Sequence, residues 1–266
     1  MAHEQPHETT QSFWEHLEAL RWAILRSLGV LLVAMVGFFA AMPWLFDHLI
    51  LAPTHGDFLL YRWIARLAGG EFAVSYQQFD VELINIRVAS QFMTHISTSF
   101  WCALVATFPY LIYEIWRFVR PALYRAERRA VAAAFSTGTA LFFAGCAVGY
   151  LVVFPIMFRF LADYQLSAEI ANQIALHSYM GNFLGTIFMM GVAFELPILT
   201  WLISRIGIVT REQLKYYRRH AVVILLIAAA LITPSGDPFT LMVVFLPLYL
   251  LYEAGICFAH PAERKS

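Results

Sequence analysis

Long apolar stretches, separated by short polar segments, follow one another along most of this sequence. A helix needs about 20 apolar residues to cross roughly 30 Å of hydrocarbon, and several of the stretches reach that length. The pattern predicts an all-α integral membrane protein in which the 266 residues form one polytopic domain with six transmembrane helices. The predicted spans cover residues 22–46, 91–116, 131–158, 180–203, 221–234 and 238–257.

The fifth and sixth spans are predicted to be short. The cluster from Pro234 to Pro238 breaks a helix and predicts a tight turn between them. The apolar runs on either side hold about 14 to 17 residues, which as helix extend only about 21 to 25 Å. A bilayer adapts to such a mismatch by thinning locally or by drawing polar flanks inward, so the membrane would be easier to perturb there.

Two regions outside the spans carry structure of their own. Residues 1–21 are predicted to form an amphipathic N-terminal helix at the cytoplasmic membrane surface, because Phe13, Leu17 and Leu20 fall on one stripe. Residues 47–90 form the long extracytoplasmic loop, with a helical stretch at 59–67 and an extended stretch at 72–86.

Capping residues predict where two later helices begin. Thr210 and Gln213 form a capping box at the start of a basic helix that leads into the fifth span. Asp237 is the N-cap of the sixth span, and Pro238 occupies its first turn. These signals place helix starts within a residue or two, which hydrophobicity alone does not.

The basic residues gather on one side of the predicted spans. They precede the first span, fill the connections after the second and fourth spans, and follow the sixth. Of the 18 lysines and arginines, the opposite side holds only Arg62, Arg66, Arg87 and Arg159. Because cytoplasmic loops are enriched in Lys and Arg, both termini are predicted to be cytoplasmic, in a multi-pass protein of the cytoplasmic (inner) membrane.

The composition excludes two broad classes of protein. With 60% hydrophobic and only 14% charged residues, the chain is not an ordinary soluble enzyme. The formal net charge of zero gives no global basic field that would recruit nucleic acid. Cys102, Cys146 and Cys257 lie far apart inside apolar runs, so they indicate neither a disulfide framework nor a metal site.

Candidate chemistry first occurs in the cytoplasmic connection at 118–129. There Glu127 lies among four arginines, Arg128 included. The connection could serve only as a topology determinant. Alternatively, Glu127 stays ionised and accepts an incoming guanidinium through two parallel hydrogen bonds. Glu18, one turn after Glu15, offers a second carboxylate at the same membrane face, or belongs to an ordinary solvated helix surface.

Glu195 is the most unusual single residue, because it lies ten residues before Arg205 and therefore deep in the hydrocarbon. An acid there costs roughly 2.5 to 3.5 kcal/mol to insert, so it is expected to face other helices and to have a role. Pro197 removes the backbone hydrogen bond to Ala193 and bends the helix nearby. The alternative is a protonated side chain hydrogen-bonded between helices.

No catalytic or metal-binding pattern accompanies these residues. His95 and His177 flank one membrane face on separate spans, without the spacing of a metal site. The sequence has neither an HExxH motif nor a GxSxG serine turn. An enzyme is therefore rejected, and no cofactor is expected.

Several motifs together resemble the TatC family, the core receptor subunit of the twin-arginine protein translocase. They are HLEALR at His16–Arg21, FPYLIYEIWRF at Phe108–Phe118, PALYRAERR at Pro121–Arg129, FELP at Phe194–Pro197, and LITP at Leu231–Pro234 leading to Asp237. Their order and spacing extend the likeness over nearly the whole chain.

The resemblance implies a function and its residues. The chain would bind Arg-Arg signal peptides of folded cargo at its cytoplasmic face through Glu127, with Glu18, Arg21, Phe118 and Arg128 completing the site. Glu195 and Asp237 would supply intramembrane polar contacts for the single-span partners TatA and TatB. The chain would also self-associate in a complex among membrane lipids, and the proton gradient would power export.

Three positions depart from the family pattern. The family usually carries a glutamate where this chain has Ala19, with a carboxylate only at the adjacent Glu18. A step of one residue turns a helical side chain by about 100°, so Glu18 substitutes only if the helix rolls. The turn from Thr233 to Asp237 is one residue longer than the common form, and Leu241 replaces a frequent glutamine.

Two other functional classes remain to be distinguished. A small secondary transporter would use Glu195 as a proton or cation site, and predicts solute flux by the purified protein alone. A structural membrane scaffold without a ligand predicts no crosslink between the surroundings of Glu127 and an Arg-Arg peptide.

Overall fold

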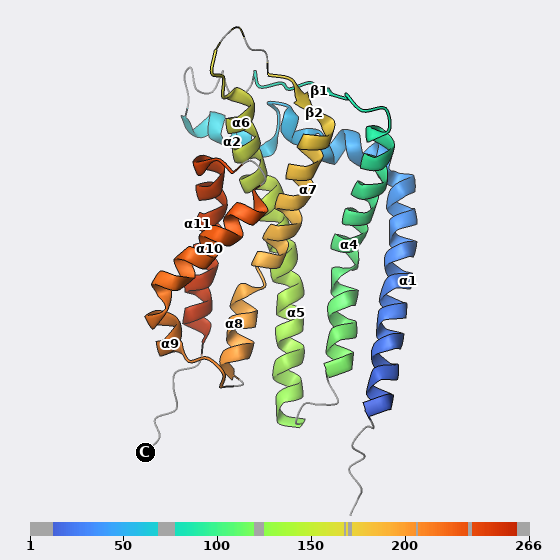
Figure 1. Cartoon of the computed structure of the whole chain (residues 1–266), viewed down its shortest axis with the longest axis vertical. Helices are drawn as coiled ribbons and strands as arrows, with labels where there is room; N and C mark the ends of the chain where they lie inside the picture. The colour runs from blue at the N-terminus through green and yellow to red at the C-terminus, as the bar shows by residue number, and fades with distance from the viewer. Residues whose placement is uncertain are drawn as a thin grey trace, which may run out of the picture.

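The computed structural model describes residues 13–68, 78–119, 125–167, 169, 172–205, 207–233 and 236–259. Long helices run roughly side by side, and a layer of short elements covers one end of them (Figure 1). In chain order the elements are α1 (Phe13–Leu45), η1 (Phe46–Ile50), η2 (Ala52–Thr54), α2 (Leu59–Ala68), β1 (Leu83–Ile84), α4 (Ser90–Val119), α5 (Arg125–Val148), η4 (Gly149–Val153), α6 (Phe154–Asp163), β2 (Ile174–Ala175), α7 (Leu176–Ala193), α8 (Leu196–Arg205), α9 (Arg211–Tyr216), α10 (Arg218–Ile232) and α11 (Pro238–Phe258).

The two ends of the bundle differ. We call the end where α1 begins and α11 ends the terminal end, and the opposite end, covered by η1, η2, α2, β1 and β2, the cap end (Figure 1). Helix α4 ends and α5 begins at the terminal end as well (Figure 1). Of the predicted N-terminal surface helix at 1–21, residues 1–12 lie outside the described residues; residues 13–21 continue into the first span without a break, since α1 runs for 33 residues.

The fold is that of an all-helical membrane protein. Within the described residues, 5 helical segments are long and apolar enough to cross a membrane: Leu17–Thr54, Ser90–Phe118, Ala132–Asp163, Leu176–Arg205 and Pro238–Phe258. They correspond to five of the six predicted spans. The predicted fifth span is α10, whose 15 residues extend only about 22 Å.

The prediction of a short sixth span is wrong. Helix α11 has 21 residues and extends about 31 Å, enough to cross the hydrocarbon. The length estimate counted only the apolar run that ends before Glu253, whereas the predicted bounds, 238–257, include the residues beyond it, and the helix continues past Glu253. The Glu253 carboxylate is paired within the chain, because Arg218 of α10 donates to it at 2.6 Å and Tyr249 at 3.1 Å.

Proline and a histidine shape the contact between α1 and α4 near the cap end. Pro43 lacks an N–H, so the carbonyl of Phe39, four residues earlier, loses its helical partner. The Nε2 of His95 on α4 donates to that carbonyl at 2.8 Å, and the imidazole stacks on the Phe39 ring with centroids 3.9 Å apart. His95 therefore compensates for the proline in the neighbouring helix.

Three tyrosine hydroxyls hold the cap end together. The π-helical turns η1 and η4 interrupt regular helix at the points where α1 and α5 reach the cap. Tyr150 donates to the Leu49 carbonyl at 2.9 Å, Tyr179 donates to the Ile50 carbonyl, and Tyr61 donates to the Pro155 carbonyl at 3.1 Å. These tyrosines thus donate hydrogen bonds to backbone carbonyls in and beside the irregular turns.

The predicted elements of the long loop are partly present. Helix α2 covers the stretch expected to be helical. Of the stretch expected to be extended, the described part contributes β1, which pairs in parallel with β2 through Leu83 and Ile174. Residues 69–77 lie outside the described residues.

Candidate functional site

An ion pair joins α1 and α4 near the terminal end. Arg26 donates from Nε to Oε1 of Glu114 at 3.0 Å and from Nη2 to Oε2 at 2.9 Å. This bidentate, charge-assisted ion pair is the strong arrangement of an arginine and a carboxylate. Glu114 is only 3% exposed, so the carboxylate is held between the two helices.

Two further residues of α4 surround the same carboxylate. The Tyr110 hydroxyl donates to Oε1 of Glu114 at 2.9 Å, and Nη1 of Arg117 lies 4.0 Å from Oε1. Both lie within one helical turn of Glu114, at spacings that bring side chains together. The side chain of Arg26 is 38% exposed against 4% for Glu114, so the guanidinium covers the carboxylate from outside.

Glu114 is not among the binding residues that the sequence predicts, although it lies within the motif FPYLIYEIWRF, and its partner Arg26 is 88 residues away along the chain. The usable signal was the spacing of Tyr110, Glu114 and Arg117 along one helix face.

The predicted binding residues lie closer to the terminal end than this ion pair. Helices α1 and α4 are antiparallel, since Arg26 near the start of α1 meets Glu114 near the end of α4. Arg21 precedes Arg26 by about 7.5 Å of helix, and Phe118 follows Glu114 by about 6 Å. Glu18 and Arg21 are exposed and Phe118 is half-buried.

The other predicted binding residues are on α5. Glu127 and Arg128 belong to its first turn, which begins at Arg125. Their side chains lie outside the described residues, so their contacts stay predictions. Ala19, the position where the family usually has a glutamate, is exposed on α1.

Glu195 lies in the turn between α7 and α8, where the sequence predicts a distortion. Helix α7 ends at Ala193 and α8 begins at Leu196, so the predicted bend is a two-residue turn, which backbone hydrogen bonds such as Leu199 N–H to the Glu195 carbonyl still bridge. Its Oε1 is buried and has no hydrogen-bond partner within the described part of the chain. The carboxylate packs against Gly138 of α5, where an added Cβ would lie 2.8 Å from Oε2.

Asp237 caps α11, as predicted. Its Oδ1 accepts from the Thr240 backbone N–H at 2.8 Å, and its Oδ2 accepts from the Thr240 hydroxyl at 2.6 Å. The structure therefore accounts for Asp237 as a helix cap, and its predicted part in partner contacts stays a prediction.

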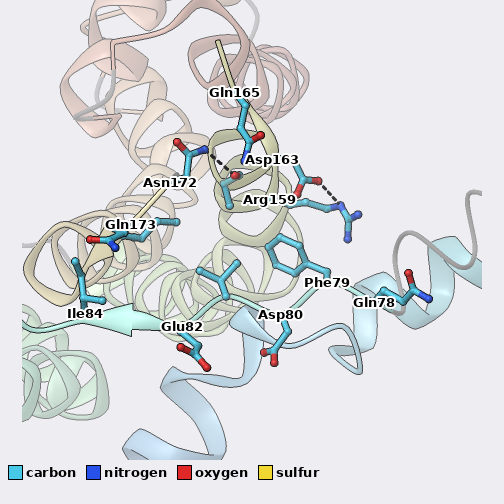
Figure 2. Close-up of a pocket in the computed structure, with 13 residues that line it drawn as sticks. Gln78, Phe79, Asp80, Glu82, Ile84, Arg159, Asp163, Gln165, Asn172 and Gln173 are labelled. Carbon is cyan, nitrogen blue, oxygen red and sulfur yellow. Dashed lines mark hydrogen bonds and ion pairs between the residues drawn. The ribbon is translucent and has the colours of Figure 1, made fainter. Parts of the chain in front are cut away.

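A polar pocket of about 850 Å³ opens at the cap end. Figure 2 shows its lining, with Gln78, Asp80 and Glu82 from the loop before β1 on one side and Asn172 and Gln173 on the other. Arg159 of α6 pairs with Asp163 at 3.2 Å, and its guanidinium lies 4.7 Å from the Phe79 ring centroid. The pocket lies opposite the predicted binding residues.

The described side chains do not meet the requirements of a metal site. Across the described ranges, no group of three or more His, Cys, Asp or Glu could hold a metal ion. The cluster at Glu114 combines one carboxylate with two guanidinium groups and a phenol, which suits recognition of charged groups.

Known proteins resemble this chain over nearly its full length. The family model described as TatC, Sec-independent protein translocase protein, matches residues 15–247. The Sec-independent protein translocase protein TatC of Blattabacterium is 32% identical over 258 residues, covering 95% of this chain and 96% of that protein. TatC of Escherichia coli K12 is 32% identical over 260 residues, covering 95% and 89% of the two chains.

Solved structures agree with the sequence comparison. A crystal structure of the twin arginine translocase receptor TatC superposes with a TM-score of 0.72 at 28% identity, covering 92% of this chain and 97% of that one. A second crystal structure of the same receptor, in DDM, gives a TM-score of 0.73 at 27% identity, covering 92% and 99%.

Proposed function

The chain belongs to the TatC family and is the receptor subunit of a Sec-independent, twin-arginine translocase, and from this premise we propose that it binds Arg-Arg signal peptides at its terminal end. It is a transport protein and not an enzyme. The observation that supports this location of the binding site is the ion pair between Arg26 and Glu114, in which a carboxylate near the terminal end already binds a guanidinium.

Glu127 is the proposed primary contact. Its carboxylate binds one guanidinium of the peptide as a fork, so a lysine, which offers a point charge, binds less well. Arg128 keeps Glu127 ionised, and Glu18 and Arg21 complete the polar site from α1. The apolar part of the signal peptide lies along Phe118, which is half-buried at the end of α4.

Glu195 is the proposed contact for single-span TatA and TatB subunits. A carboxyl group in the membrane interior is expected to have a polar partner, and a partner helix can supply it. The turn between α7 and α8 supports this role, since Pro197 has no N–H to donate to the Ala193 carbonyl, which is therefore available to a neighbouring helix. Asp237 contributes at the start of α11, and copies of the chain self-associate in the complex.

The proposed orientation places both termini in the cytoplasm, with the cap end outside. The positive-inside bias of the connections supports it. Export of folded cargo is then powered by the proton gradient, without a nucleotide site in this subunit. The competing class, a small secondary transporter that uses Glu195, gains nothing from the comparisons, because the relatives named above are all translocase proteins.

Site-specific photocrosslinking tests the proposed binding. A photoreactive amino acid at Ala126, next to Glu127, is expected to crosslink an Arg-Arg signal peptide when the chain is assembled with its partners in membranes. The same peptide with Lys-Lys in place of Arg-Arg is the ligand control. A photoreactive group at Ile86, which is exposed at the cap end, is the positional control. Equal crosslinking of both peptides, or none at Ala126, would contradict the proposal.

A further inference from the structure

We propose that Glu114 is a second guanidinium-binding carboxylate of the receptor, which Arg26 occupies at rest and which a signal-peptide arginine takes over on binding. The proposal rests on the proposed function and deepens it, because it assigns a residue to the second arginine of the pair. It starts from the ion pair between α1 and α4, which spans 88 residues of sequence.

The geometry at Glu114 is that of a ligand site already filled. Both carboxylate oxygens receive hydrogen bonds from one guanidinium, at 3.0 Å and 2.9 Å. Tyr110 donates a further bond to Oε1 at 2.9 Å, and this bond fixes the orientation of the carboxylate. The Glu114 carboxylate is therefore oriented to bind a guanidinium through two hydrogen bonds, whether the arginine belongs to this chain or to a signal peptide.

The exposure of the two partners suits an exchange. Glu114 is enclosed, whereas the side chain of Arg26 is half-exposed and forms the outer cover of the pair. Replacing one guanidinium by another keeps the buried carboxylate neutralised, so no unpaired charge is left between the helices. Arg117, within 4.0 Å of the same oxygen, remains in either state.

The location links Glu114 to the predicted peptide path. Phe118 lies one turn farther along α4, and Arg21 lies between the ion pair and the start of α1. The carboxylate is therefore about 6 Å deeper in the bundle than Phe118.

A second cluster makes a matched control. Arg218 of α10 donates to Glu253 of α11 at 2.6 Å, and Tyr249 donates to the same carboxylate from four residues away. The chemical groups are the same as in Arg26, Glu114 and Tyr110, and the cluster lies toward the same end. It joins helices other than α1 and α4, so it is not expected to respond to the peptide.

The alternative is that the ion pair only fastens α1 to α4. The two roles predict different effects of Arg26→Lys on peptide binding. If residue 26 competes with the peptide for Glu114, then lysine, which pairs with the carboxylate more weakly than arginine does, makes the peptide bind more tightly. If the ion pair only holds α1 against α4, then lysine weakens that helix contact, and the peptide binds equally or more weakly.

The experiment measures binding of a fluorescent Arg-Arg signal peptide to the full chain, assembled with its single-span partners in nanodiscs. Arg26→Lys is expected to lower the Kd by about fivefold, and Glu114→Gln to raise it by about tenfold. Arg218→Lys is expected to leave it unchanged. Weaker or unaltered binding by Arg26→Lys overturns the proposal.

A double variant covers the case in which an unpaired carboxylate impairs folding. Arg26→Gln combined with Glu114→Gln leaves no charge unpaired, and it is expected to bind the peptide as weakly as Glu114→Gln alone. Binding at the wild-type level by the double variant overturns the proposal. Failure of the proposed function is distinguishable, since the wild-type chain would then bind no peptide, or would bind it unchanged after Glu127→Gln.

Discussion

Gly138 of α5 and Glu195 of the α7–α8 turn lie so close that a Cβ on the glycine would come within 2.8 Å of a carboxylate oxygen. A side chain at position 138 therefore competes with Glu195 for the same space. The glycine lets the acid lie against α5, where one of its oxygens is buried.

Gly138→Ala is expected to displace Glu195 and to lower the co-purification of TatA and TatB with this chain. The atoms in the way are the end of the flexible Glu195 side chain, so the carboxylate moves aside and the expected effect is on its position rather than on the stability of the bundle. Gly181→Ala on α7 is the control, because a Cβ there meets nothing within 4 Å. Partner yields after affinity purification in mild detergent give the comparison, and equal yields for the two variants would refute the expected displacement.

Glu195→Ala is expected to reduce the same co-purification, because it removes the polar group that a partner helix would contact. Glu195→Gln retains a similar size and a hydrogen-bonding end, so it should keep more of the complex. Native gels report the size of the assembly. An unchanged complex with Glu195→Ala would mean that Glu195 serves only in packing within the bundle.

Glu127→Gln is expected to abolish export of an Arg-Arg reporter protein while leaving the abundance of the chain unchanged. The amide is nearly isosteric but cannot form the charge-assisted fork with a guanidinium. Glu82→Gln, an exposed carboxylate at the cap end, is the matched control and should export normally. Normal export with Glu127→Gln would remove Glu127 from the binding site.

Tyr179→Phe is expected to destabilise the cap end by about 1–2 kcal/mol, because the Ile50 carbonyl loses its hydrogen-bond donor in a buried place. Tyr164→Phe is the control, since that side chain is 62% exposed. Thermal unfolding in detergent, followed by intrinsic fluorescence, measures both. A midpoint for Tyr179→Phe that matches the control would show that the hydrogen bond contributes nothing to stability.

A cysteine at Ala126 is expected to resist membrane-impermeant reagents added to intact cells and to react once the cells are opened. The expectation follows from the basic residues around this connection. The native cysteines should first be replaced by serine or alanine. A cysteine at Ile86 is the counterpart, expected to react in intact cells. Labelling of position 126 from outside would reverse the orientation and remove the basis of the proposed function.

The sequence predicts those features that depend on neighbouring residues. Thr210 and Asp237 cap their helices as expected, since a cap involves residues three positions apart. The break near Glu195 follows from Pro197 alone. The apolar run alone underestimates the length of α11, because it stops before Glu253, whose carboxylate is paired with Arg218, a residue 35 positions away that a hydrophobicity count does not consider.

Some residues of the candidate site can likewise be predicted from the sequence, and others are recognised only in the folded structure. Glu127, Glu18 and Arg21 stand out as charges in motifs, so sequence patterns are enough to propose them. Glu114 is chemically similar, but what marks it is the fork from Arg26, and only folding brings the two together. Likewise nothing in a linear pattern pairs His95 with the carbonyl that Pro43 frees.

Helix α1 is fastened to α4 at two places, through Arg26 to Glu114 and through the Phe39 carbonyl to His95. The two ties are about 20 Å apart along the helix. Together with the packing between the two helices, these contacts fix the position of α1 along α4. If the contact at Arg26 opens, the contact at Phe39 remains, and the start of α1, which carries Glu18 and Arg21, is expected to gain freedom to move relative to α4.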